Sequence, residues 1–201
     1  MAVVAFLDTC VLYPATLRDV ILTLAEVGIC RIRWSPDVLA ELERTYIKLS
    51  PLDPVAARAG AHYVIEIMKD AFPDAMVEQS HYTPLIPAMP NDIKDRHVLA
   101  AAIASRADVL VTANLNDFRV PDGFCDTDIQ HPDKFLCYQL ELAPQDFFHA
   151  LDDLASHRRE PMNTVQGILR SLQKTVPDFA SRALIESFRR PLVVLLAFLG
   201  G

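Results

Sequence analysis

The feature that most constrains the fold is an alternation of short apolar runs with helical segments. Residues 2–7 form an uninterrupted apolar run that stops at Asp8, which is typical of a parallel strand buried on both faces. Further buried strands are expected over 29–34 and 108–112, with helices between them. Strands that alternate with helices form a parallel sheet covered by helices on both faces. The pattern therefore predicts a three-layer α/β fold.

The intervening segments carry helix signals. Apolar residues at three-to-four spacing and capping residues indicate helices over 16–28, from Ser35 onward, over 54–71 and over 92–106. Ser35 is followed by a proline and an acid, which is a strong helix start. Shorter elements are expected as a strand over 75–77, a weak strand at Ile129 and a helix from Pro132.

The pattern changes near residue 144 and becomes purely helical. Apolar positions such as Phe147, Leu151, Ile168 and Leu172 recur with the spacing of amphipathic helices. We therefore expect two regions, an α/β domain over 1–143 and a helical extension over 144–201. No repeat or low-complexity segment interrupts either region.

The charge of the chain is acidic and unevenly distributed. The net charge is −7, with 12 Lys and Arg against 21 Asp and Glu over 1–150, and 7 against 5 over 151–201. A protein that holds nucleic acid mainly by its own surface should be basic. Either metal ions neutralise a carboxylate pocket while the basic tail assists, or the acidity only serves solubility. Net charge alone does not separate these two interpretations.

Other motifs are informative by their absence. The four cysteines lie among apolar neighbours without a C-x-x-C pair, and the six histidines show no zinc-binding spacing. The apolar start has no basic flank, and the longest uncharged apolar stretch, Leu192 to Leu199, is far shorter than the roughly 20 residues of a membrane span. The expected location is therefore the cytoplasm, without membrane contact.

Several acidic residues occupy positions that suit a catalytic site. Asp8 ends the first strand and Asp117 follows the strand over 108–112, so both belong to the edge where ligands bind in parallel sheets. A carboxylate that ends a buried strand is costly to desolvate unless it is paired or bound to a metal. Taken alone, Glu41 could be a solvent-facing helix residue, Asp117 a turn cap, and Asp95 part of a capping box that begins at Asp92.

Together these residues resemble the PIN domain family, whose members include the VapC-type toxin ribonucleases. Four segments carry the resemblance: Phe6-Leu7-Asp8-Thr9; Ser35-x5-Glu41-Leu42; Asp95-x2-Val98-Leu-Ala-Ala-Ala102; and Val111-Thr112-x-Asn114-x2-Asp117-Phe118. Their order and spacing follow the predicted strands and helices over residues 3–137. The last sixty or so residues and the long connection between Glu41 and Asp95 depart from the compact toxin pattern.

The resemblance implies a metal-dependent ribonuclease. It implies that Asp8 and Asp95 are the main ligands of Mg²⁺ or Mn²⁺, that Glu41 and Asp117 complete the site partly through water, and that RNA is the substrate. Hard cations prefer carboxylate oxygens, and four crowded acids repel one another without such an ion. Thr9 and Asn114 are candidate polar groups for substrate or for metal-bound water. A toxin of this kind implies a cognate antitoxin, and a homodimer is a further expectation.

One alternative stays open: a PIN-fold protein that mainly binds a protein or RNA. The run Leu192 to Leu199 could dock an antitoxin or a second subunit, or pack on its own domain. Arginines 158, 159, 189 and 190 could contact phosphates or be solvated helix ends. His97 is expected to pack or cap its helix, because a metal site needs no further general acid.

Overall fold

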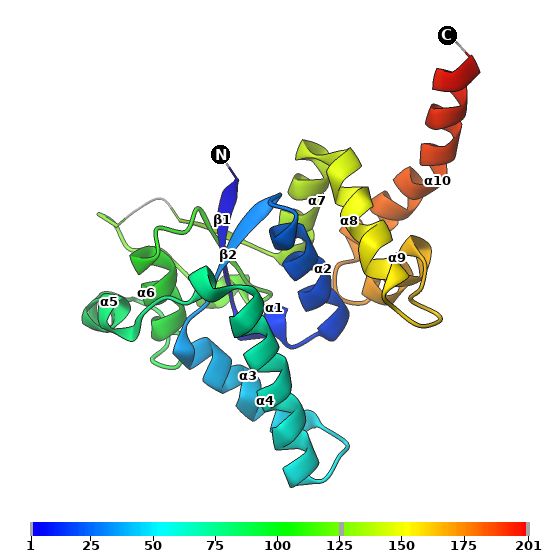
Figure 1. Ribbon diagram of the computed structural model, residues 1–201. Coiled ribbons are helices and arrows are strands. Elements are labelled where there is room, and N and C mark those ends of the chain that lie inside the picture. Colours follow the sequence, from blue (N-terminus) through cyan, green and yellow to red (C-terminus); the bar gives the residue numbers. More distant parts are fainter. Residues whose placement is uncertain (1, 125–126, 200–201) are drawn as a thin grey trace. The chain divides into compact units, whose positions relative to one another are not determined.

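The structure is a computed structural model that describes residues 2–124 and 127–199, with side chains described as far as Arg189. Its chain contacts divide it into two units. Unit 1 comprises Met1–Arg18 and Cys30–His131, and unit 2 comprises Asp19–Ile29 and Pro132–Gly201. Figure 1 labels the elements of both units, and each unit is described by itself.

Unit 1 is built on a parallel sheet of four strands, as the alternating pattern predicts. The strands are β1 (Val3–Leu7), β2 (Cys30–Arg33), β3 (Val109–Val111) and β4 (Asp128–Gln130). Their order in the sheet is β2-β1-β3-β4, and every neighbouring pair is parallel. The three residues of β3 are all buried, which explains why its sequence is continuously apolar.

The strand order reverses beside β1. The chain passes from β1 to β2 on one side of the sheet, and it later returns to the other side with β3. Open parallel sheets bind ligands outside the carboxyl ends of the strands at such a switch point. Asp8 directly follows β1 and Thr112 directly follows β3, and the Asp8 amide donates to the Val111 carbonyl at 3.1 Å. The topology therefore brings these two residues to the same edge.

The helices of unit 1 include one that begins at the predicted cap Ser35. They are α1 (Thr9–Leu12), α3 (Pro36–Leu49), α4 (Pro54–Ala71), α5 (Gln79–Tyr82) and α6 (Arg96–Ala104), with 3-10 turns η1 (Pro73–Ala75), η2 (Thr83–Ala88) and η3 (Leu115–Asp117). The Ser35 hydroxyl accepts a hydrogen bond from the Val38 amide at 3.3 Å and caps α3. Asp53 caps α4 in the same way, through the amides of Val55 and Ala56.

Two local predictions are wrong. No strand forms over 75–77. Met76, directly after η1, makes an isolated β-bridge with Trp34, and a single bridged pair does not constitute a strand. In addition, α6 begins at Arg96 and not near Asp92. The Asp92 carbonyl accepts from the amides of Asp95 and Arg96 at 2.9 and 3.1 Å. This turn precedes the helix, so Asp95 lies at the cap position instead of inside the first turn.

Unit 2 is helical throughout its described part. It contains most of α2 (Ala15–Glu26), together with α7 (Pro132–Leu142), α8 (Pro144–Ser156), α9 (Val165–Leu172) and α10 (Pro177–Leu199). The rings of Phe147 and Phe179 pack with centroids 5.5 Å apart in its core. The side chains of the run Leu192 to Leu199 lie outside the described residues, so its predicted docking role stays a prediction. Within the described part of the chain, no helix has the length and apolarity of a membrane span.

Candidate active site

Asp8 is a buried carboxylate held by three donors. Its side chain is 6% exposed, and it lies at the N-cap of α1, where its Oδ1 accepts from the Thr9 amide at 2.6 Å. Its Oδ2 accepts from the Thr112 hydroxyl at 2.7 Å and from the Cys10 thiol at 3.1 Å. Hydrogen bonds to an ionised acceptor are short and strong, and they compensate the loss of water. These bonds fix the orientation of the carboxylate.

Thr112 and Cys10 are site residues that the sequence reasoning did not select. The Thr112 side chain is fully buried, and its hydroxyl oxygen also accepts from the Asn114 amide at 3.1 Å. The Cys10 thiol contacts Asp8 and Thr112, so it is not only a buried apolar group. Burial, and then the charge of Asp8, raise the pKa of this thiol to about 12. The signal for Thr112 was its place directly after a buried strand.

Glu41 lies in a second polar group formed with Thr9 and His97. Its Oε2 accepts from the Thr9 hydroxyl at 3.0 Å, and its Oε1 lies 3.0 Å from His97 Nε2. Burial raises the pKa of Glu41, but the hydrogen bond and charge of His97 outweigh burial and leave the pKa below its usual 4.5. Burial lowers the pKa of His97, and Glu41 in turn raises it above 6.5. His97 therefore pairs with Glu41 instead of capping its helix.

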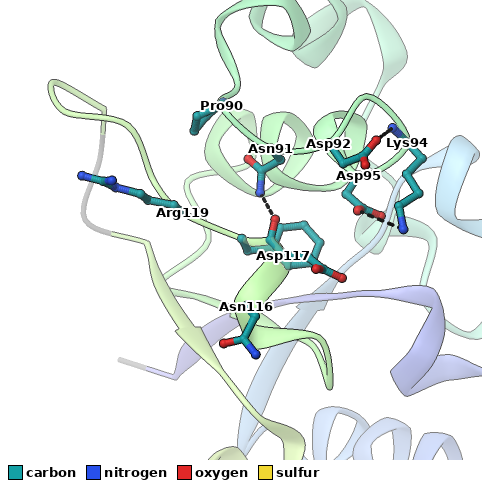
Figure 2. Close-up of a pocket in the computed structure, with 9 residues that line it drawn as sticks. Pro90, Asn91, Asp92, Lys94, Asp95, Asn116, Asp117 and Arg119 are labelled. Atoms are coloured by element: carbon teal, nitrogen blue, oxygen red, sulfur yellow. Dashed lines mark hydrogen bonds and ion pairs between the residues drawn. The ribbon is translucent and has the colours of Figure 1, made fainter.

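Asp95 and Asp117 line an open pocket of about 420 Å³ (Figure 2). Asp95 lies at the N-cap of α6 but makes no capping hydrogen bond. Its Oδ2 is buried without a hydrogen-bond partner in the described chain, and the nearest cation is Lys94 Nζ at 3.7 Å. Burial raises the pKa of Asp95, Lys94 opposes this, and repulsion from Asp117, Asp8 and Asp92 adds to it. The capping-box interpretation of Asp95 is therefore wrong.

Asn91 connects the two segments that carry these acids. Its Nδ2 donates to the main-chain carbonyl of Asp117, and its own carbonyl accepts from Arg96 Nε at 2.9 Å. The side chain is 7% exposed, and its Oδ1 has no partner within residues 2–124 and 127–199. Figure 2 shows Asn91 pointing at Asp117 from the loop before α6. No local pattern distinguishes this asparagine from a loop residue, and the sequence reasoning missed it.

The predicted site residues are brought together only in part. Asp95 and Asp117 share the pocket, whereas Asp8 and Glu41 are not among the residues that line it. Asp8 lies near enough to repel Asp95, and Glu41 is tied to Asp8's neighbour Thr9. In the described residues no three or more Asp, Glu, His or Cys side chains form a group that could hold an ion as they stand.

The two predicted substrate-binding residues differ in their surroundings. Thr9 is buried, and its hydroxyl is engaged by Glu41 and by the Val38 carbonyl at 3.2 Å. Asn114 is exposed, and its amide donates to Thr112 at the carboxyl end of β3. Asn114 is thus exposed at this edge, whereas the Thr9 hydroxyl is engaged inside the protein; their predicted contacts with substrate stay predictions.

The comparison with known families decides how this site is classified. The profile of the family described as "PIN domain" matches residues 4–116, which is more than half of the chain. The chain belongs to the PIN domain family. The match covers Asp8, Glu41 and Asp95 and ends one residue before Asp117.

A second family and one named protein are also similar to this PIN protein. Residues 132–184 match a family described as "VapC50 C-terminal domain". A protein of Mycobacterium tuberculosis named "Putative ribonuclease VapC50" is 40% identical over 104 residues, which cover 51% of this chain and 61% of that relative. The matched stretch therefore spans less than two thirds of the relative's length. No solved structure matches the chain.

Outside the PIN match, the basic residues of unit 2 are partly engaged. Arg158 forms an ion pair with Asp19 of the same unit, so it is not a solvated helix end. Arg159 and Arg189 are exposed, and the side chain of Arg190 lies outside the described residues. Their predicted contacts with phosphates stay predictions.

Proposed function

We propose that this PIN domain protein is a Mg²⁺- or Mn²⁺-dependent endoribonuclease that hydrolyses RNA phosphodiesters, and that it is the toxin of a toxin–antitoxin pair. The observation that carries the proposal is the carboxylate of Asp95 beside an open pocket: its buried Oδ2 accepts no hydrogen bond in the described chain, and Asp117 and Asp8 repel it. Crowded like charges are costly unless a cation compensates them. The name of the mycobacterial relative supports RNA as the substrate.

The donor set fits a hard divalent cation. Asp8 and Asp95 would be its main ligands, and Asp117 and Glu41 would complete the site partly through water. An ion held by carboxylates supplies an activated water nucleophile and neutralises charge on the phosphate. Asp95 Oδ2 has no hydrogen bond to give up within the described chain, which favours its recruitment as a ligand atom.

The protein's own residues hold the acids ready. Thr112 and the Thr9 amide hold the Asp8 carboxylate in one orientation, because each donates a hydrogen bond to one of its oxygens. His97 and the Thr9 hydroxyl do the same for Glu41. Asn114, exposed beside Thr112, would contact the RNA that enters over this edge.

We assign catalysis to unit 1 and partner contacts to the C-terminal helices. The match of 132–184 to the "VapC50 C-terminal domain" supports a role in this type of toxin, with a cognate antitoxin as the partner. A homodimer and a cytoplasmic location are parts of the same proposal. The alternative, a PIN-fold module that binds RNA or protein without cleaving it, predicts binding that does not depend on the acids.

Cleavage of RNA by the purified protein separates the two functions. We expect cleavage with Mg²⁺ or Mn²⁺, none in excess EDTA, and a loss of at least about a hundredfold in Asp8→Asn. Asp70→Asn is the matched control, because Asp70 is an exposed acid at the end of α4, outside the site. Undiminished cleavage in EDTA, or by Asp8→Asn, would refute the metal mechanism. RNA binding without any cleavage would favour the binding module.

A further inference from the structure

The pocket beside Asp95 and Asp117 contains two cations of different origin. Lys94 comes from the loop before α6, and Arg119 comes from the segment after η3. In Figure 2, Lys94 lies beside Asp95 on one side of Asp117, and Arg119 lies on the other side. Among the residues that line this pocket, these two carry the positive charge. An acidic cleft is thus bordered on two sides by side chains that attract anions.

Lys94 is only loosely held by the protein. Its ammonium lies 3.7 Å from Asp95 Oδ2, which is beyond hydrogen-bond distance, and its side chain is 70% exposed. Exposed ion pairs contribute about 0–1 kcal/mol, so little opposes a move of this side chain to another anion. A divalent ion bound by Asp95 would compensate the same carboxylate and would displace Lys94 toward the solvent side of the pocket.

The backbone of Arg119 is fixed by packing of its neighbour, while its guanidinium has no partner among the described residues. The preceding Phe118 is 7% exposed and ties the segment to the core. The Arg119 guanidinium makes no hydrogen bond or ion pair with any residue of 2–124 or 127–199, and the side chain is exposed. Arginine in this state is suited to bind phosphate, since its planar fork donates two parallel hydrogen bonds.

We propose that Lys94 and Arg119 bind backbone phosphates of single-stranded RNA on either side of the phosphodiester that lies over Asp95 and Asp117. This proposal rests on the proposed ribonuclease function. A pocket of about 420 Å³ has the size of a small-molecule site, which suits a short part of one strand. Contacts with phosphate position a strand without reading its sequence. The two cations therefore set affinity and alignment, and leave base preference to other residues.

The test is the salt dependence of RNA binding by the full-length protein. Wild type, Lys94→Gln, Arg119→Gln and the double variant are each titrated into a fluorescent single-stranded RNA. Binding is followed by fluorescence anisotropy in the presence of Ca²⁺ at several salt concentrations. Each single substitution should weaken binding about tenfold at low salt. Each should also reduce the slope of log affinity against log salt by about 0.7, and the double variant should reduce it by about 1.4.

Arg31→Gln is the matched control. Arg31 is also an exposed arginine of unit 1, but it lines a separate pocket with Val3 and Asp108 at the amino ends of the strands. The substitution Arg31→Gln removes the same charge from the same unit and should leave the slope of log affinity against log salt unchanged. If Arg31→Gln lowered the RNA affinity and the slope equally, the effect would be one of overall charge, and the proposal would be overturned. Unchanged slopes in the Lys94 and Arg119 variants of a protein that cleaves RNA would also overturn it. Absence of cleavage by wild type would instead refute the proposed function.

The metal dependence gives a second readout for Lys94. Because Lys94 and the ion both compensate Asp95, Lys94→Gln should lower the half-saturating Mn²⁺ concentration while it weakens RNA binding. Arg119→Gln should weaken RNA binding without changing the Mn²⁺ requirement. A variant Lys94→Gln that binds RNA and Mn²⁺ as wild type does would contradict the assignment.

Discussion

Thr112→Val tests whether the hydroxyl at the end of β3 holds Asp8 in place. Valine has nearly the shape of threonine but cannot donate the buried 2.7 Å hydrogen bond to Asp8 Oδ2 or accept the Asn114 amide at 3.1 Å. A hydrogen bond to a charged group contributes about 1.5–3 kcal/mol, and the unpaired Asn114 amide adds to this cost. Since 1 kcal/mol shifts the melting temperature of a protein of this size by about 2–4 °C, we expect a loss of roughly 3–12 °C.

Thr127→Val is the control for Thr112→Val. The Thr127 hydroxyl is also buried, but it donates to the neutral Ala107 carbonyl at 2.9 Å, away from the acids. Differential scanning fluorimetry should show a smaller loss for this variant, since neutral hydrogen bonds contribute about 0.5–1.5 kcal/mol. Only Thr112→Val should also raise the Mn²⁺ concentration needed for cleavage. The reasoning would be refuted if the two variants were equally stable and equally active.

Two further predictions use the pKa shifts of the site. In EDTA at neutral pH, Asp95→Asn should have a free energy of unfolding about 1 kcal/mol higher than wild type, because it removes a partly buried charge that the neighbouring acids repel. The pKa of Asp95 in the folded protein lies above its usual 3.8, so the stability of wild type should approach that of Asp95→Asn as the pH falls through the folded pKa toward 3.8. A difference in free energy of unfolding that widens over this range would contradict the prediction. His97→Gln should cost about 1 kcal/mol below pH 6.5, and less as the pH rises through the raised folded pKa, in urea unfolding from pH 5.5 to 8.5. A pH-independent cost would exclude the charged pair with Glu41.

The sheet could be predicted from sequence because its signal is local. β1 and β3 are continuous apolar runs, and the caps Ser35 and Asp53 lie directly before the helices that they start. The errors arose where a local pattern has two solutions. The two aspartates three residues apart resembled a capping box, but the Asp92 carbonyl closes a turn that delays the helix to Arg96.

The links that organise the site could not be predicted because they are long-range. The hydrogen bond between Thr112 and Asp8 spans 104 positions, the contact of His97 with Glu41 spans 56, and the bond from Asn91 to Asp117 spans 26. Each partner has an ordinary local explanation, such as strand end, helix face or loop. Only the fold places them together, so the sequence pointed to the four acids as candidates but not to the residues that contact them.

Direct binding of Mn²⁺ to the protein without RNA tests the central claim, that this cluster of acids holds a catalytic metal. Electron paramagnetic resonance counts free Mn²⁺ during a titration of wild type, Asp95→Asn and Asp70→Asn. Wild type and Asp70→Asn should take up Mn²⁺ with the same affinity. Asp95→Asn should bind at least about tenfold more weakly, because it lacks a buried carboxylate oxygen that accepts no hydrogen bond in the described protein and lies near other acids. Equal uptake by wild type and Asp95→Asn would contradict the account.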